Sequence, residues 1–275
     1  MSTRIGTVFG QELRQARRNL WVILATAVLG LFALALALFG AGQGSGLKVD
    51  VLTLTAVSLA TLSVYLIPLI ALLMSYDSIS GEVERGSLAL TFATPVRRWE
   101  VFVGKFLAQT VAVCVAILIA FGTVGCVIAL LSETGQDGIF AWLRLMLTAG
   151  GLGAIFVGIG LMVSALTCRT ARAAAAAVGV WLLLVVLYDV ALLGAIMAAG
   201  EGIFATHVFP WLVIANPADA FRLYNLAMID AAPVAGIDGL AQTLPFPPVA
   251  ALAALGIWLV ATIAIGSART RRIVP

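Results

Sequence analysis

Long apolar runs separated by short polar stretches dominate the chain. Six such runs cover residues 20–41, 52–74, 106–131, 143–167, 173–199 and 249–268. A hydrocarbon core of about 30 Å is crossed by about 20 helical residues, so each run predicts a transmembrane helix. The pattern predicts an all-α membrane protein with six transmembrane helices in a single domain, 1–275.

Composition supports this class of protein. The chain is 62% hydrophobic and 11% charged, whereas soluble domains are roughly 45–50% apolar and about 25% charged. A net charge of +3 is too small and too dispersed for a nucleic-acid-binding protein. Three cysteines without a CxxC motif and a single histidine argue against a disulfide framework or a zinc site.

The basic residues predict the orientation of the spans. Thirteen of the 16 Lys and Arg residues fall on one side if six spans alternate, leaving only Lys48, Arg144 and Arg222 on the other side. Basic residues are retained in the cytoplasm, so both termini are expected inside a bacterial inner membrane. The first run is too long for a signal-peptide core, and we interpret it as an uncleaved span; the small residues at 40–44 leave cleavage open.

The leader and the longest external loop each predict a helix outside the spans. Residues 1–19 place Ile5, Val8 and Phe9 before several arginines, which suggests an amphipathic helix on the inner surface. In the external loop 200–248, the sequence Asn216-Pro217-Ala218-Asp219 combines a capping residue, a first-turn proline and a first-turn acid. An interfacial helix is expected there, with an apolar face of Phe221, Tyr224 and Met228.

Asp189, beside Tyr188, is the one ionisable group well inside a predicted span. A carboxylate at this depth is costly and invites a functional interpretation. A structural role is also open, in which Tyr188 or a polar group on a neighbouring span forms a hydrogen bond with it. A proton relay would need an intramembrane histidine, lysine or second acid, which the sequence does not offer.

No catalytic residue or metal site is expected in this chain. Cys114 and Cys126 lie about 120° apart around a helix, and His207 is isolated in the external loop, so neither a chelating set nor a Ser–His pair is implied. Residues 81–86 have the glycine spacing of a phosphate-binding loop, but the required lysine is missing. The chain is therefore expected to bind no ATP and no cofactor itself.

Small residues recur on two spans. Gly150, Ala154 and Gly158 are spaced four apart, and alanines fill 173–177. Such stripes allow helix backbones to approach closely in lipid. Packing within the chain and a dimer interface are both open.

The predicted cytoplasmic loop 75–105 has the most informative polar pattern. Glu82 and Glu84 suit the start of a short helix that Pro95 ends, and Thr94-Pro95 would begin the helix into the third span. The remaining charges are expected to meet lipid, with Arg97 and Arg98 at headgroups and Lys105 snorkelling. The pattern is compatible with an ordinary solvated connector. It is also compatible with a lever, that is, a short helix between two spans that a partner on the inner side can move.

The sequence Glu84-Arg85-Gly86-Ser87-Leu88, followed by Thr94 to Arg98 and then Gly104-Lys105, resembles the signature loop of type-two ABC exporter permeases. Segments 68–90, 186–193 and 210–226 are similar, within that family, to permeases that serve nitrous oxide reductase maturation. The similarity covers essentially the full chain.

This resemblance implies a type-two ABC exporter permease fold, a homodimer, an amphipathic elbow helix at 1–19 and a cytoplasmic coupling loop at 75–105. It implies a separate cytoplasmic ATPase that binds ATP and Mg, a periplasmic β-helical partner, and support for assembly of the copper–sulfur site of nitrous oxide reductase. The residues expected at the ATPase are Glu82, Glu84, Arg85, Gly86, Leu88, Pro95, Arg97 and Arg98. Those expected at the periplasmic partner are Phe209, Trp211, Asn216, Pro217, Arg222 and Tyr224.

Two alternatives are compatible with the sequence. The same fold could export a hydrophobic drug, lipid or peptide, or the chain could be a secondary carrier or scaffold that uses no ATPase. Whether copper, a sulfur species or only mechanical force is transmitted is left open.

Overall fold

The computed structural model describes residues 2–16, 20–40, 50–88, 97–132, 134–167, 169–199, 204–228 and 245–270. Every regular element in this part of the chain is a helix. In chain order they are α1 (Ser2–Ala16), α2 (Leu20–Gly40), α3 (Val51–Ser75), α4 (Ser80–Glu84), α6 (Arg98–Leu131), α7 (Gln136–Leu166), α8 (Thr170–Trp181), the π-helix η2 (Leu182–Leu187), α9 (Tyr188–Ala199), the π-helix η3 (Phe204–Val208), α10 (Phe209–Ala215), α11 (Pro217–Ala227) and α13 (Val249–Thr270).

Five helical stretches are long and apolar enough to cross a membrane: Val51–Glu84, Arg98–Leu131, Gln136–Leu166, Thr170–Ala199 and Val249–Thr270. They correspond to the second to sixth predicted spans. The first predicted span is helix α2, whose apolar part in the described residues, Val22–Leu38, is shorter. The chain is thus an all-helical membrane protein with five long candidate spans.

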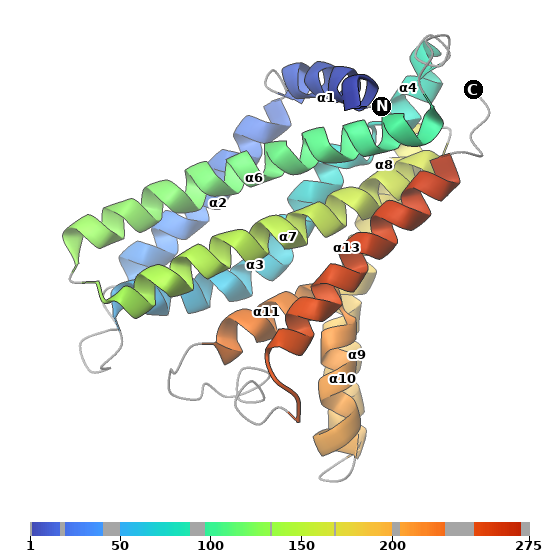
Figure 1. Ribbon diagram of the computed structural model, residues 1–275. Coiled ribbons are helices and arrows are strands. Elements are labelled where there is room, and N and C mark those ends of the chain that lie inside the picture. Colours follow the sequence, from blue (N-terminus) through green and yellow to red (C-terminus); the bar gives the residue numbers. More distant parts are fainter. Residues whose placement is uncertain are drawn as a thin grey trace.

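Helices α3, α6 and α7 form the centre of the bundle, and α2, α8–α9 and α13 lie around them (Figure 1). The most apolar part of α7 is 67% buried, whereas that of the continuous helix α8–η2–α9 is only 11% buried. Gly158 on α7 faces Thr262 on α13, where a Cβ atom would lie 2.8 Å from the Thr262 hydroxyl. Part of the predicted small-residue stripe therefore serves close packing within the chain.

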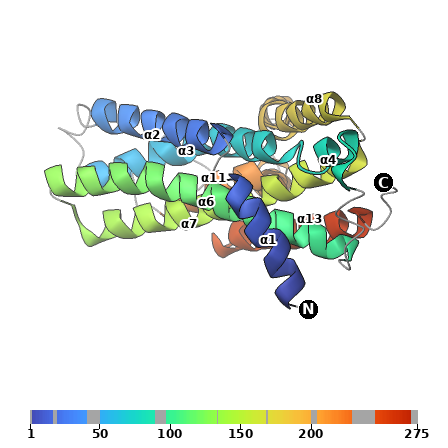
Figure 2. The same cartoon turned by 90° about the horizontal axis from the view of Figure 1, so that it is seen from above.

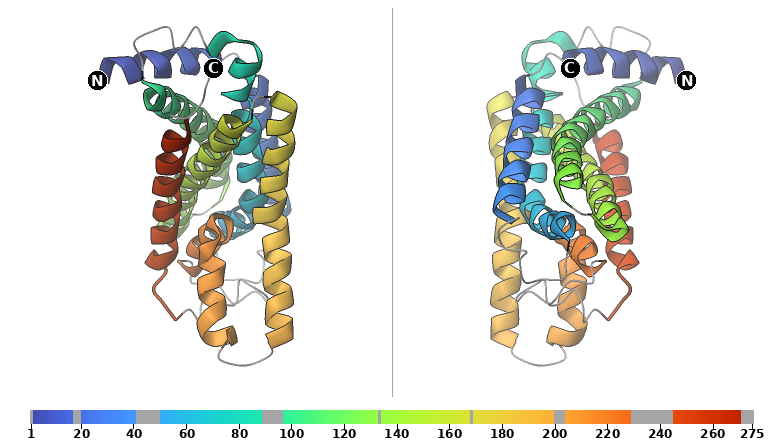
Figure 3. Two further views of the ribbon diagram at one scale, coloured as in Figure 1. Left: turned by 90° about the vertical axis from the view of Figure 1, so that its right-hand side faces the viewer. Right: turned by 90° about the vertical axis from the view of Figure 1, so that its left-hand side faces the viewer.

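The two ends of the bundle differ. Helix α1 crosses α6 at one end, near α4 and the end of α13 (Figure 2). At the opposite end α9 and α10 run side by side and α11 turns back against the bundle (Figure 3). We call these the α4 end and the hairpin end, and we call α10–α11 the outer hairpin.

The sequence located the start of α11 correctly. Asn216 precedes the helix, its side-chain oxygen accepts a hydrogen bond from the Ala218 N–H at 3.0 Å, and Pro217 occupies the first turn. The predicted apolar face is confirmed only in part: Phe221 is buried, Tyr224 is half-buried and Met228 is exposed. The polar residues Asp219, Arg222 and Asn225 are buried instead. Helix α11 packs against α3, α7 and α13, so several sides of it are covered.

The predicted start of the helix into the third span was wrong. Helix α6 begins at Arg98, with Arg97 as its capping position, and the Arg97 N–H donates to the Glu100 carboxylate at 2.8 Å. Glu100 at the third helical position satisfies a backbone donor at the helix start, as in a capping box. Thr94 and Pro95 lie outside the described residues.

Candidate functional site

The short helix α4 lies at the α4 end, where three other helices hold it in place. It follows α3 after a four-residue turn and ends at Glu84. Gly86 comes two residues later, and its φ of +70° lies in the left-handed region that glycine tolerates. The hydroxyl oxygen of Ser164, near the end of α7, accepts hydrogen bonds from the Ile79 and Ser80 N–H groups at 2.9 Å each. These donors belong to the capping position and the first residue of α4, whose N–H groups have no acceptor within the helix.

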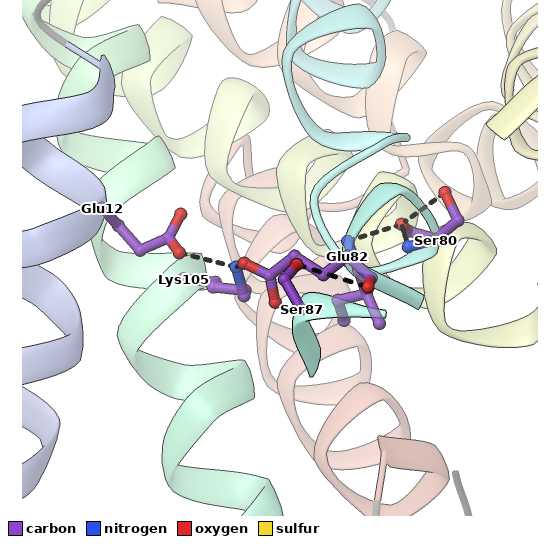
Figure 4. A network of polar contacts seen from close by, with 7 residues as sticks. Glu12, Ser80, Glu82, Ser87 and Lys105 are labelled. Atoms are coloured by element: carbon purple, nitrogen blue, oxygen red, sulfur yellow. Dashed lines mark hydrogen bonds and ion pairs between the residues drawn. The ribbon is translucent and has the colours of Figure 1, made fainter. Parts of the chain in front are cut away.

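Lys105 of α6 connects α4 to α1. Its Nζ lies 2.6 Å from Oε1 of Glu12 and 2.7 Å from Oε1 of Glu82 (Figure 4). Lys105 is only 2% exposed, so the prediction that it snorkels to the lipid surface was wrong. A buried ammonium is tolerated when carboxylates surround it, and two carboxylates can share one cation.

Glu84 connects α4 to α8. One of its carboxylate oxygens accepts a hydrogen bond from the Thr170 N–H at 2.9 Å and a second bond from the Thr170 hydroxyl. Thr170 is the first residue of α8, where the helix dipole favours a negative charge. The predicted lever helix is therefore bonded to α6, α7 and α8 at once.

A polar cavity of about 90 Å³ opens beside this junction. Its lining includes three carboxylates, from Glu12, Asp77 and Glu82, and two cations, from Arg85 and Lys105. Polar side chains are therefore concentrated where α1, α4 and α6 meet.

The predicted ATPase-coupling residues gather at this end, in different surroundings. Glu84, Arg85 and Gly86 are exposed, Glu82 is half-buried, and Leu88 is buried in the core. At the start of α6, Arg97 is exposed and Arg98 is half-buried. Pro95 lies outside the described residues.

Sequence reasoning missed Glu12, Ser164 and Thr170 as members of this network. Glu12 could have been found, since it is the only acidic residue in the basic leader 1–19. Ser164 and Thr170 carry no such signal, because their roles depend on where α7 ends and α8 begins.

Helix α1 approaches α6 closely at Gly104, where an added Cβ atom would lie 2.7 Å from Cγ1 of Val8. We expect Gly104→Ala to displace α1 and to cost about 1–3 kcal/mol of its docking, the usual penalty for overpacking. Hydrogen exchange of the α1 amides in the intact protein measures this, with faster exchange expected. Adding Val8→Ala restores the space and should slow the exchange again; unchanged exchange in Gly104→Ala would contradict the contact.

At the hairpin end, Asp189 pairs with an arginine from another element. Nη2 of Arg222 lies 3.4 Å from Oδ1 of Asp189 and 2.5 Å from Oδ1 of Asp219. Burial, with a smaller contribution from the nearby Asp189, raises the pKa of Asp219 to about 8 against the lowering effect of Arg222. Two carboxyl groups thus face one guanidinium, and this supports a structural role for Asp189.

The other residues predicted to contact an external partner divide into two groups. Phe209, Asn216, Pro217 and Arg222 are buried within the chain. Trp211 is 55% exposed, with its ring 4.7 Å from that of Phe246, and Tyr224 is half-buried. Among these six residues, Trp211 and Tyr224 offer the surface for a partner.

Within the described ranges, no group of three or more His, Cys, Asp and Glu side chains could hold a metal ion. Cys114 and Cys126 are free thiols. The polar networks at both ends consist of ion pairs and hydrogen bonds that join helices.

Comparison with known proteins defines the class. Residues 7–272 match the family described as ABC-2 family transporter protein. The chain therefore belongs to the ABC-2 family and is a multi-pass membrane permease. This family lacks an ATPase domain, which confirms the prediction of a permease subunit without an ATP-binding site of its own. Membership of the family implies a partner ATPase.

Two individual relatives are similar along nearly their whole length. The chain is 34% identical over 270 residues to the probable ABC transporter permease protein NosY of Pseudomonas aeruginosa, covering 98% of both chains. It is 33% identical over 272 residues to the protein of the same name from Stutzerimonas stutzeri, again covering 98% of both.

Proposed function

We propose that the chain crosses a bacterial inner membrane six times, with α2 as the first span and the α4 end in the cytoplasm. The distribution of basic residues supports this orientation. Arg14, Arg85, Arg169 and Arg269 belong to elements at the α4 end, whereas Arg144 and Arg222 are the basic residues described towards the hairpin end. Positive charge retained on the inner side has this pattern.

We propose that a separate cytoplasmic ATPase of the NosF type docks on α4 and moves it. The observation that carries this proposal is the set of bonds from α4 to Ser164, Lys105 and Thr170, which join it to three long helices. Exposed Glu84, Arg85 and Gly86 provide the docking surface beside those bonds. ATP and Mg would be bound by the ATPase, so this chain contributes mechanical coupling.

We propose that the chain supports maturation of the copper–sulfur site of nitrous oxide reductase. In this role the permease acts as a homodimer beneath a periplasmic β-helical partner of the NosD type. Similarity to two proteins named NosY over 98% of their length supports this assignment. The exposed Trp211 and half-buried Tyr224 at the hairpin end are the residues proposed to contact the periplasmic partner.

Charge reversal at α4 tests the coupling. Glu82→Lys with Glu84→Lys places a second cation against Lys105 and a cation at the start of α8, where the helix dipole disfavours it. We expect the double variant to reduce nitrous oxide reduction in cells, or ATPase stimulation in the purified complex, by at least about tenfold. A tenfold loss corresponds to about 1.4 kcal/mol of coupling free energy.

The matched control is Asp137→Lys, a charge reversal at an exposed position in the first turn of α7, away from the α4 end. It should retain activity. Full nitrous oxide reductase maturation by the α4 double variant would contradict the lever assignment.

An apolar groove supports a second candidate cargo. It has a volume of about 150 Å³ between α2 and α3 and is lined only by apolar side chains, among them Leu24, Val28, Leu69 and Leu73. A hydrophobic drug, lipid or peptide would suit such a lining. Stimulation of the bound ATPase by hydrophobic compounds, without any effect on nitrous oxide reduction, would favour this alternative. Membership of the ABC-2 family argues against the third alternative, a secondary carrier or scaffold that uses no ATPase.

A further inference from the structure

The helix α8–η2–α9 is a long helix bonded to the α4 network at its start and to the outer hairpin further along. It begins at Thr170, where Glu84 of α4 is bonded, and ends at the hairpin end. Because only 11% of its apolar window is buried, few side-chain contacts hold it against the bundle centre. A peripheral helix with few buried contacts opens or shifts at lower free-energy cost than a central one.

The helix changes its hydrogen-bonding pattern halfway along. Between Leu182 and Leu187 it is a π-helix, and the Tyr188 N–H donates to the Leu183 carbonyl, five residues back. In a regular α-helix that N–H would bond to the Leu184 carbonyl instead. Here the Leu184 carbonyl accepts a hydrogen bond from Nδ2 of Asn216 at 2.5 Å. A π-helical turn inside an α-helix often marks a functional site.

Two further bonds join the same region to the outer hairpin. The Tyr188 hydroxyl donates to the Leu212 carbonyl of α10 at 2.7 Å. Arg222 of α11 pairs with Asp189, the residue after Tyr188. The outer hairpin is therefore bonded to the π-helical segment and the turn that follows it through Asn216, Leu212 and Arg222.

The other side of the outer hairpin is bonded to different helices. Nε1 of Trp258 on α13 donates to the Ala215 carbonyl at 2.9 Å. Nδ2 of Asn225 donates to the Thr148 hydroxyl on α7 at 2.9 Å. The outer hairpin thus lies between the peripheral helix α8–α9 and the more central bundle, so a shift of α8–α9 would change its position relative to α7 and α13.

We propose that the π-helical segment Leu182–Leu187 is a hinge through which movement of α8 reaches the outer hairpin, and that Asn216 and Tyr188 are the positioning residues that transmit it. The proposal rests on the proposed function, since it takes α4 as the input. The order of transmission is Glu84 to Thr170, along α8 to η2, and then through Asn216 and Tyr188 to α10 and α11. Coupling of this kind requires an element with two arrangements that both ends influence.

Two substitutions remove the transmitting donors with little other change. Asn216→Ser keeps a neutral oxygen that can cap α11, because Ser and Asn cap helices about equally well, but it loses the Nδ2 donor to Leu184. Tyr188→Phe keeps the ring and loses the donor to Leu212. Trp258→Phe is the matched control, because it removes one hydrogen bond to the outer hairpin from α13 instead of from α8–α9.

The experiment is hydrogen exchange of the α10 and α11 amides in the purified permease–ATPase complex, with and without ATP trapped on the ATPase. In the unaltered protein we expect ATP to change these exchange rates by about tenfold. The double variant Asn216→Ser, Tyr188→Phe should lose that change while keeping the ATPase bound and the ATP-free exchange of α11 intact. Trp258→Phe should retain it.

Each other outcome has a defined meaning. An ATP-dependent change that persists undiminished in the double variant would overturn the hinge, and so would a complete complex whose outer hairpin does not respond to ATP. A loss of the response in Trp258→Phe equal to that in the double variant would also overturn it, because the path would then not be specific to α8–α9. Absence of any ATPase from the purified complex would instead overturn the proposed function, and the hinge with it.

Discussion

Replacing Lys105 by methionine is expected to detach α1 and α4 from α6. The substitution keeps the side-chain length and removes the cation that holds Glu12 and Glu82 at 2.6 and 2.7 Å. Two carboxylates then share a largely buried space without a counter-charge. Removing one partner of a buried ion pair costs about 3–5 kcal/mol, which is a large fraction of a typical protein's stability.

The thermal midpoint of the permease in lipid nanodiscs and its retention of the ATPase both measure this effect, and both should fall in Lys105→Met. Arg14→Met, which removes an exposed cation on α1, should change neither by much. Adding Glu12→Gln and Glu82→Gln to Lys105→Met removes the uncompensated charges and should restore most of the stability. Near-equal stability of Lys105→Met and the unaltered protein would contradict the network.

Replacing Arg222 by leucine is expected to have the second-largest effect. Arg222 is 5% exposed and is the cation facing Asp189 and Asp219, so its loss leaves two carboxyl groups close together in a buried site. A penalty of about 3–5 kcal/mol follows where both are charged. Adding Asp189→Asn and Asp219→Asn should recover stability, because no buried charge then remains.

The cost of Arg222→Leu should depend on pH. Burial raises the pKa of Asp219 to about 8 in the folded protein, so the folded state binds this proton more tightly than the unfolded state does. Its contribution to stability is complete below the unfolded pKa of about 4 and is lost as the pH rises through 8. Arg222 lowers that folded pKa, so without it the loss of stability between pH 6 and pH 9 should be larger. Thermal midpoints across this range measure the difference, and parallel curves would contradict the assignment.

Local patterns in the sequence predicted much of the fold. Apolar runs located five helices of spanning length, and Asn216-Pro217-Ala218-Asp219 located the start of α11, because capping depends on neighbouring residues. Glu82 lies in the first turn of α4 as predicted, whereas Glu84 is the last residue of that helix. These features follow from contacts within a few positions of the chain.

The pairing of charges across the fold could not be predicted in the same way. Lys105 meets Glu12 from 93 positions away, and Arg222 meets Asp189 from 33 positions away. From the sequence alone, Lys105 was predicted to snorkel to the lipid surface and Arg222 was predicted to contact a periplasmic partner. Their burial depends on how α1, α9 and α11 pack, which periodicity does not specify.

The central claim is that α4 receives a separate ATPase. The most direct test places a photo-crosslinking amino acid at Arg85, which is exposed beside Glu84, and at Ile139 on α7, away from the α4 end, as the control. The proteins crosslinked in native membranes are then identified by mass spectrometry. A nucleotide-binding ATPase subunit crosslinked from position 85 and absent from position 139 is the predicted result. An ATPase that crosslinks equally from both positions, or from neither, would contradict the claim.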